Sequence, residues 1–201
     1  MCKICINRIE KNTKVEGFGI RYCIWVQGCS IRCEGCANQE LWEFGQAPLY
    51  SVDEIVSDIL AQKDRIEGIT IMGGEPMDQK RAIARLLPRV KSKGYTIIVF
   101  TGYVYEDLKS RGDVDIEVIM ENVDLLIDGQ FIKKLLDFSR PWVGSINQRY
   151  LFLSGRYSEQ MIEKANTKLK IEIRIGTDGR IKINGMNDMN KLKRLIDIEE
   201  D

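Results

Sequence analysis

The sequence predicts an α/β fold in which parallel strands form an incomplete, open β/α barrel. Short apolar runs bounded by glycine alternate along the chain with segments of helical spacing, a pattern typical of parallel strands joined by helical crossovers. A complete eight-unit barrel takes about 250 residues, and this chain has 201. The chain is therefore long enough for only part of such a barrel.

The first strand is expected at Ile20–Val26, an apolar run rich in β-branched and aromatic residues that leads directly into a cysteine-rich loop. A helix should begin after Ser51, because Ser51 and Glu54 form a capping box in which each side chain binds a free backbone amide of the other residue. The second strand is expected at Gly68–Met72, a short apolar run that begins at a glycine and ends before one.

The middle of the chain continues this alternation. Asp78–Lys93 shows helical spacing, and Pro88 should kink or shorten the helix because it lacks an amide proton. Tyr95–Phe100 is expected to form the third strand, Tyr105–Ser110 a short helix and Val123–Ile127 the fourth strand. Functional loops of such a fold lie at the carboxyl ends of the strands, which is where the cysteine loop falls.

The last part of the chain has a different character. Leu169–Ile175 and Arg180–Asn184 alternate around a Gly-Thr-Asp-Gly turn and predict a hairpin, and a charged helix should follow from about Asn187. We therefore divide the chain into a partial-barrel core, residues 1–155, and an appendage of hairpin and helix, residues 156–201, packed on that core.

Composition and charge exclude several classes of protein. The 30 basic residues balance 30 acidic residues, so no overall positive field draws the chain to nucleic acid or to anionic lipid. No apolar run approaches the roughly 20 residues that span a bilayer, and the first residues lack the apolar core of a signal peptide. We expect a cytoplasmic protein without nucleic-acid or membrane partners.

Three cysteines with a close spacing predict a metal site. Cys29, Cys33 and Cys36 lie within eight residues, and the chain contains no histidine. A metal site here must therefore depend on sulfur ligands, to which carboxylates could be added. Soft thiolate ligands favour iron–sulfur clusters or zinc. A four-iron cluster normally takes four cysteines, so three close ligands suggest that one iron is left open to a small molecule.

The other cysteines allow an alternative. A zinc site that borrows Cys2, Cys5 or Cys23 as its fourth ligand would be closed and would only stabilise the fold. Cys2 and Cys5 are expected to be free thiols near the terminus, and Cys23 is expected to be a small buried side chain within the first strand.

A second motif ends the second strand. Gly73 and Gly74 let the backbone approach a ligand closely, and the carboxylate of Glu75 can bind an ammonium group. The ends of neighbouring parallel strands lie at the same edge of a sheet. We therefore expect this motif to face the cysteine loop.

Together, the cysteine spacing and the Gly-Gly-Glu-Pro sequence resemble the two signature motifs of the radical S-adenosylmethionine enzymes. Within that family the chain looks most like the activating proteins of glycyl radical enzymes, above all those of anaerobic ribonucleotide reductase. The resemblance covers residues 15–155. The matching stretches are Glu16–Arg21, Val26–Cys29, Gly35–Asn38, Thr101–Tyr103, Asp124–Phe131 and Gly144–Arg149.

This resemblance implies a cofactor pair. Cys29, Cys33 and Cys36 would ligate a [4Fe–4S] cluster whose fourth iron binds the amino and carboxylate groups of S-adenosylmethionine. Gly74 and Glu75 would hold the amino group.

The resemblance also implies further cofactor-binding residues. Gly73, Gly35 and Asn38 lie in its matched motifs and would contact the cofactors. Arg149 would pair with a carboxylate of the cofactor, and Asp128, at the end of the fourth strand, would take a ribose hydroxyl or an ammonium group. For Asp128 and Arg149, an ordinary salt bridge or a turn cap is an equal alternative.

The implied reaction is hydrogen abstraction. An electron from the cluster would cleave the sulfonium, and the resulting 5′-deoxyadenosyl radical would take a hydrogen atom from a glycine of a partner glycyl radical enzyme. A flavodoxin or ferredoxin would supply the electron. Two alternatives stay open: the same chemistry on a small molecule or ribosomal peptide recognised by the appendage, and a zinc-stabilised interaction module without catalysis.

Overall fold

A mixed seven-stranded sheet forms the centre of the protein in a computed structural model that describes residues 2–165 and 170–185. Its strands, in the spatial order β3-β1-β2-β4-β5-β6-β7, are β1 (Lys3–Thr13), β2 (Arg21–Val26), β3 (Leu49–Ser51), β4 (Gly68–Gly73), β5 (Thr96–Phe100), β6 (Leu125–Asp128) and β7 (Arg149–Phe152). A separate hairpin consists of β8 (Ile171–Ile175) and β9 (Ile181–Gly185).

Helices connect these strands. The α-helices are α1 (Val52–Leu60), α2 (Lys80–Lys91), α3 (Tyr105–Ser110), α4 (Val114–Asn122) and α5 (Glu159–Lys164), and the 3₁₀ helices are η1 (Gln39–Leu41), η2 (Pro76–Gln79) and η3 (Lys133–Leu135). None of the helices in the described part of the chain is long and apolar enough to cross a membrane.

The four predicted strands form the parallel middle of the sheet. β2, β4, β5 and β6 are neighbours in this order and pair in parallel, and the pairing of Val26 with Gly73 brings the ends of β2 and β4 together. The alternation of strands and helices therefore predicted the α/β class and these four strands. β1 and β7 flank them in antiparallel orientation, and β3 pairs antiparallel with the outer edge of β1. These three strands were not predicted.

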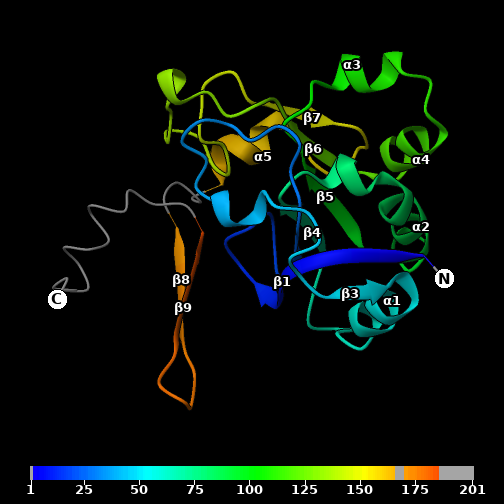
Figure 1. The fold of residues 1–201 in the computed structure, drawn as a ribbon, viewed down its shortest axis with the longest axis vertical. Coiled ribbons are helices and arrows are strands. Elements are labelled where there is room, and N and C mark those ends of the chain that lie inside the picture. Colours follow the sequence, from blue (N-terminus) through cyan, green and yellow to red (C-terminus); the bar gives the residue numbers. More distant parts are fainter. Residues whose placement is uncertain (1, 166–169, 186–201) are drawn as a thin grey trace, which may run out of the picture.

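Helices cover one face of the sheet, as Figure 1 shows for α1, α2 and α4. The largest apolar cluster fills this interface and includes Ile24, Ile71 and Val99 from the strands and Ile59 and Leu86 from the helices. The predicted capping box is confirmed: the Ser51 hydroxyl accepts from the Glu54 amide at 3.1 Å, and the Glu54 carboxylate accepts from the Ser51 amide at 2.6 Å. Burial of this interface is the main force that holds the helices to the sheet.

The helices differ from the sequence-based expectation at two places. Pro88 was expected to kink or shorten its helix, yet α2 continues beyond it to Lys91. Burial of Leu87 and Val90 against the sheet accompanies this last turn, so tertiary packing offsets the cost of proline there. The helix α4 was not predicted, because its apolar residues do not form a strong stripe; only Ile116 and Ile119 are buried.

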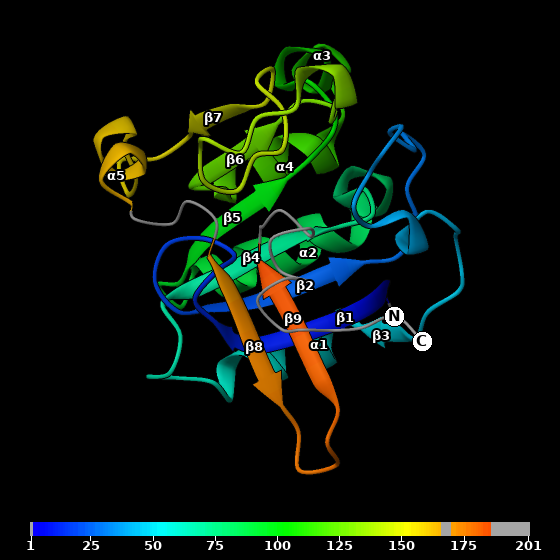
Figure 2. The same ribbon diagram turned by 90° about the vertical axis from the view of Figure 1, so that its left-hand side faces the viewer.

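The hairpin β8–β9 lies against the opposite side of the sheet, where it crosses β1 in Figure 2. Its polar side chains face β1: Glu172 accepts a hydrogen bond from the Thr13 hydroxyl at 2.8 Å, and Arg174 pairs with Glu10 at 3.4 Å. The other side carries isoleucines, of which Ile175 is 74% exposed. The predicted hairpin is confirmed, and the helix expected from about residue 187 lies outside the described residues.

Glu16 lies buried beneath the end of this hairpin, and its ionisation should make the protein less stable. Burial raises the pKa of Glu16 to about 7 from an ordinary 4.5, with partial opposition from Arg8 and from the Gly185 amide, while the charge of Glu172 adds to the rise. A carboxyl group with a raised folded-state pKa stabilises the protein fully below its unfolded pKa, and that contribution is lost as the pH rises to the folded value. The loss should therefore fall between about pH 4.5 and pH 7.

Comparison of the protein with its Glu16→Gln variant tests this. The melting temperature of the cluster-free protein should drop more between pH 5 and pH 8 than that of the variant, because glutamine stays neutral throughout. Equal drops in both proteins would show that Glu16 does not titrate in this range.

Candidate active site

The cysteine loop begins where β2 ends and is fixed there by the backbone. Gly28 has a φ of 98°, a conformation that favours glycine. Its amide donates to the Leu41 carbonyl at 2.8 Å, and the Cys29 amide donates to the Trp42 carbonyl at 3.0 Å. These bonds hold the start of the loop against the turn that contains η1.

The Cys29 thiol is buried and accepts hydrogen bonds from two backbone amides. Burial raises the pKa of Cys29, and hydrogen bonds from the Arg32 and Ile31 amides lower it. Arg32 has a φ of 50°, which is uncommon for a residue with a side chain. The loop thus adopts a strained turn that directs amide protons towards a sulfur atom.

Cys33 and Cys36 are half-buried and also accept hydrogen bonds. The Phe131 amide and the Gln130 side chain donate to Cys33, and these bonds oppose the rise in its pKa that burial causes. The Asn38 amide donates to the Cys36 sulfur at 3.4 Å. Each of the three sulfurs therefore has at least one N–H donor, which is typical of the thiolates that hold iron–sulfur clusters.

The donor set fits a cluster better than a single ion. Among residues 2–165 and 170–185, no group of three or more cysteine or carboxylate side chains is arranged to hold one metal ion. A zinc site requires its ligands to converge on one point, whereas each thiolate of a four-iron cluster binds a different iron. Three free thiols on one loop, each with N–H donors, fit a cluster.

The remaining cysteines lie outside this loop. Cys23 is fully buried in β2, with its sulfur 3.6 Å from that of Met72, as expected for a small core side chain. Cys5, in β1, donates to the Ala47 carbonyl at 3.3 Å, and Cys2 is a free, partly exposed thiol. The geometry gives no support to a zinc site completed by one of these cysteines.

Gly73 and Gly74 let the ends of β2 and β4 approach each other closely. A Cβ atom on Gly73 would lie 2.6 Å from the Val26 amide, and one on Gly74 would collide with the Gly28 carbonyl. The Gly74 amide donates to the Val26 carbonyl, and the Glu75 amide donates to the Gly28 carbonyl, both at 2.8 Å. The motif and the cysteine loop are therefore neighbours, as the sequence predicted.

Glu75 is almost fully buried, and its carboxylate binds the backbone around it. It accepts from the Met77 amide at 2.9 Å, the Thr101 hydroxyl at 2.7 Å and the Gly102 amide at 2.8 Å. Burial raises its pKa to about 7 although these three bonds lower it. Glu75 thus ties the end of β4 to the end of β5, which is a positioning role the sequence did not reveal.

Asp128 and Arg149 bind each other across β6 and β7. The guanidinium donates to the buried carboxylate at 3.0 and 2.6 Å, and it also pairs with Glu106 at 2.7 Å. These two carboxylates raise the pKa of Arg149. Asp128 also accepts a hydrogen bond from the Tyr105 amide at 2.8 Å. Asp128 therefore forms both a salt bridge with Arg149 and a backbone cap, which is the alternative to cofactor binding that the sequence left open.

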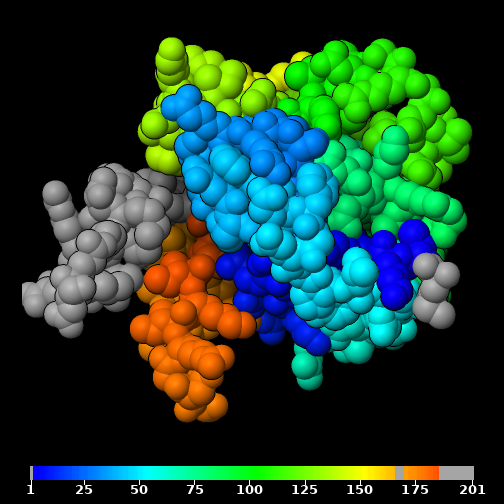
Figure 3. Space-filling view, in the orientation of Figure 1, coloured from blue at the N-terminus to red at the C-terminus, as the bar shows by residue number. Residues whose placement is uncertain are grey.

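Gly35 and Asn38 lie on the outer half of the cysteine loop. Gly35 has a φ of 76°, and a Cβ there would lie 3.1 Å from the Lys133 side chain. Asn38 precedes η1 and accepts from the Leu41 amide at 3.1 Å through its carbonyl. In Figure 3 this part of the chain, coloured blue, lies at the surface against the yellow-green segment that contains Lys133.

Sequence analysis missed residues that form hydrogen bonds with the cysteine loop from neighbouring segments. Asp78, in η2, accepts from the Ser30 amide at 2.7 Å and from its hydroxyl at 2.9 Å. The Ser30 hydroxyl also lies 3.0 Å from that of Tyr103. The sequence signal for this contact was Asp78 itself, an acidic residue two positions after the last residue of the Gly-Gly-Glu-Pro motif.

Comparison with known proteins gives a consistent result. A family model described as a 4Fe-4S single cluster domain matches residues 15–151. Proteins named anaerobic ribonucleoside-triphosphate reductase-activating protein are similar in sequence: that of Haemophilus influenzae is 34% identical over 67% of this chain and 88% of its own length, and that of Enterobacteria phage T4 is 34% identical over 71% and 90%. The protein of Escherichia coli K12 with this name is 30% identical over 67% and 89%.

Among solved structures, QueE from Escherichia coli aligns with a TM-score of 0.44 and 19% identity, over 50% of this chain and 52% of that one.

Proposed function

The chain belongs to the anaerobic ribonucleoside-triphosphate reductase-activating proteins of the radical S-adenosylmethionine family, and from this premise we propose that it installs a glycyl radical on a partner enzyme. The family carries a 4Fe-4S cluster. The observation that supports the proposal most is the loop with three free thiols, each beside N–H donors, next to the end of β4.

Cys29, Cys33 and Cys36 would each bind one iron of the cluster, and the amides around them would stabilise the charge on the sulfurs. When bound, the cluster would supply the single electron for reductive cleavage of S-adenosylmethionine, the chemistry that would allow a hydrogen atom to be taken from a glycine of the partner. A reducing compartment such as the cytoplasm would keep these thiols available as ligands.

The strand ends would position the second cofactor. Gly73 and Gly74 let the backbone after β4 lie directly against the start of the cysteine loop. The three hydrogen bonds of Glu75 tie the end of this motif to the end of β5. This arrangement would hold the amino group of S-adenosylmethionine, with Gly35 and Asn38 on the other side of the loop. Asp128 and Arg149, which are bonded to each other at the end of β6, would contribute to the binding of S-adenosylmethionine as a pair.

We further propose that the sheet is an open partial barrel, with residues 1–155 as its core and residues 156–201 as an appendage packed on it. Such an opening suits a macromolecular substrate, because a loop of the partner has to reach the cofactors. The partner would be a glycyl radical enzyme such as anaerobic ribonucleotide reductase, and a flavodoxin or ferredoxin would supply the electron.

Anaerobic reconstitution tests the proposed function. Purified protein given iron and sulfide should develop broad absorption in the blue, and with dithionite and S-adenosylmethionine it should form 5′-deoxyadenosine. Addition of the reductase from the same genome should then give the electron paramagnetic resonance signal of a glycyl radical. Absorption without 5′-deoxyadenosine would contradict the proposed chemistry, and 5′-deoxyadenosine without a glycyl radical would point to another substrate.

A further inference from the structure

A basic surface pocket lies beside the cysteine loop, between the start of β1 and the start of α2. Four cationic side chains, Lys3, Lys80, Arg81 and Arg85, line it together with a single carboxylate, Asp78. The whole chain has a net charge of zero. This local excess of positive charge is therefore a feature of the site and does not follow from the composition.

Two of these cations are available to a partner. Arg81 and Arg85 are exposed and lie one helical turn apart on α2, and neither forms an ion pair with a carboxylate in the described part of the chain. Lys80 differs, because it pairs with Asp113. An exposed pair of cations without carboxylate partners attracts a negatively charged surface more strongly than a neutralised pair does.

The wall of this pocket is in direct contact with the cysteine loop. Asp78 accepts two hydrogen bonds from Ser30, the residue after Cys29. Gln79, also in the wall, donates to the Gln27 carbonyl at 3.0 Å, which lies two residues before Cys29. The basic pocket and the inner end of the cysteine loop are thus separated by a single layer of side chains.

We propose that the basic pocket formed by Lys3, Lys80, Arg81 and Arg85 is the docking surface for an acidic one-electron carrier protein. This rests on the proposed function, which needs one electron delivered to the cluster. The reduced carrier loses one electron and the cluster gains it; no bond forms or breaks, and no proton is transferred. Charge complementarity selects the carrier, and the contact through Ser30 places it close to the cysteine loop.

The test uses the Arg81→Glu/Arg85→Glu double variant with flavodoxin as the probe. The rate of 5′-deoxyadenosine formation driven by reduced flavodoxin should fall about tenfold or more at low salt, because steering by opposite charges is lost. Formation driven by dithionite should stay unchanged. The affinity for oxidised flavodoxin, measured by calorimetry, should fall as well, which gives a readout independent of turnover.

The control is Lys63→Glu/Arg65→Glu, which reverses the same number of exposed charges near the start of β4, at the other end of the parallel strands. It should behave as the unaltered protein. Raising ionic strength from about 0.01 M to 0.1 M shortens the Debye length from about 30 Å to about 10 Å, so the unaltered protein should lose flavodoxin affinity and the Arg81/Arg85 variant should lose little.

Equal flavodoxin rates and affinities in both double variants would overturn the proposal. So would a variant that reacts normally with flavodoxin but fails to transfer the radical, because the pocket would then bind the glycyl radical enzyme. Absence of 5′-deoxyadenosine with dithionite in the unaltered protein would instead refute the proposed function, while the affinity measurement would still test the docking surface.

Discussion

Replacing Cys33 with alanine should abolish both the blue absorption of the reconstituted protein and its formation of 5′-deoxyadenosine. Cys33 lies between the other two thiols in the loop, and its sulfur accepts hydrogen bonds from the Phe131 amide and the Gln130 side chain. A cluster with three protein ligands has no spare cysteine in this loop, so loss of one leaves two irons without protein sulfur. Product should fall to the level of a protein-free blank.

Cys5→Ser is the matched control for this prediction. It also removes one of the six thiols, yet Cys5 lies in β1 and bonds to the Ala47 carbonyl, which a serine hydroxyl can also do. The control should retain about four iron atoms per chain and full 5′-deoxyadenosine formation. If Cys33→Ala kept its iron and its activity, the ligand assignment would be wrong, and loss of iron in Cys5→Ser would place that residue at the metal.

The parallel part of the fold could be predicted because its strands are buried on both faces. Such strands read as continuous apolar runs between glycines, as at β4 and β5. β1 could not be predicted in this way, because its central part carries Arg8, Glu10 and Lys11. The carboxylate of Glu10 is paired by Arg174 and Lys182 of the hairpin, two residues far away in sequence.

The site was partly predictable for a related reason. The three cysteines lie within eight residues of the sequence. Their proximity to Gly73 follows from the rule that neighbouring parallel strands end at the same edge. The hydrogen bonds of Glu75 to Thr101 and Gly102 join the ends of two strands, and nothing in either segment alone indicates them. Likewise, the bond between Asp128 and Arg149 depends on the antiparallel pairing of β7, which was not predicted.

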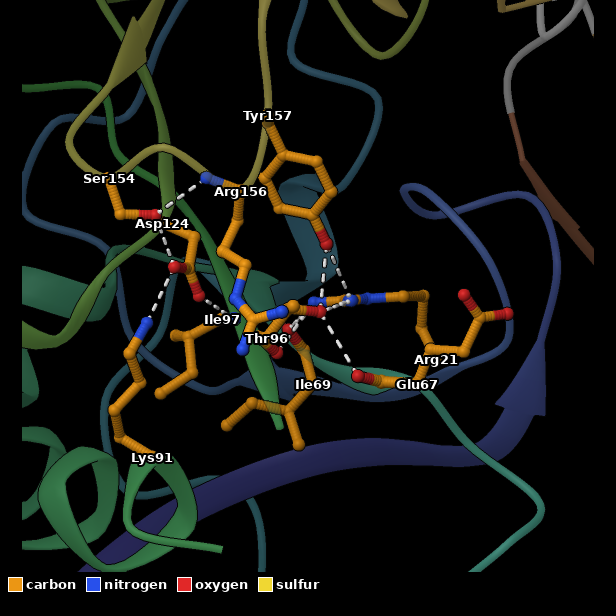
Figure 4. Close-up of polar contacts among 10 residues, drawn as sticks. All are labelled: Arg21, Glu67, Ile69, Lys91, Thr96, Ile97, Asp124, Ser154, Arg156 and Tyr157. Atoms are coloured by element: carbon orange, nitrogen blue, oxygen red, sulfur yellow. Dashed lines mark hydrogen bonds and ion pairs between the residues drawn. The ribbon is translucent and has the colours of Figure 1, made fainter. Parts of the chain in front are cut away.

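A polar network at the opposite end of the parallel strands was also missed, although its central residue lies within an apolar run. Arg21 is fully buried at the start of β2. Figure 4 shows its side chain pointing towards Thr96 and the hydroxyl of Tyr157. Its guanidinium donates to the Thr70 hydroxyl at 3.2 Å, the Thr96 hydroxyl and carbonyl at 2.5 and 3.0 Å, the Tyr157 hydroxyl at 3.1 Å, and the Ile69 carbonyl. Burial lowers its pKa, and these bonds bring together β2, β4, β5 and the segment before α5.

Replacing Arg21 with alanine should therefore cost on the order of 4 kcal/mol of unfolding free energy. Truncation of a large buried side chain leaves a cavity, and each buried hydroxyl or carbonyl that loses its donor adds about 1 kcal/mol or more. Relief of the buried charge offsets part of this cost. Urea unfolding of the cluster-free protein, followed by circular dichroism, measures the change.

Two controls separate the network from the general effect of a substitution. Tyr157→Phe removes the hydroxyl that bonds to Arg21 and to Thr96 at 2.8 Å, and should cost about 1 kcal/mol. Arg65→Ala, at an exposed arginine, should change stability by less than about 0.5 kcal/mol. If Arg21→Ala unfolded within 1 kcal/mol of Arg65→Ala, the buried guanidinium would not be what holds these strand ends together, and the apolar packing of Phe18, Trp142 and Tyr157 would have to do so.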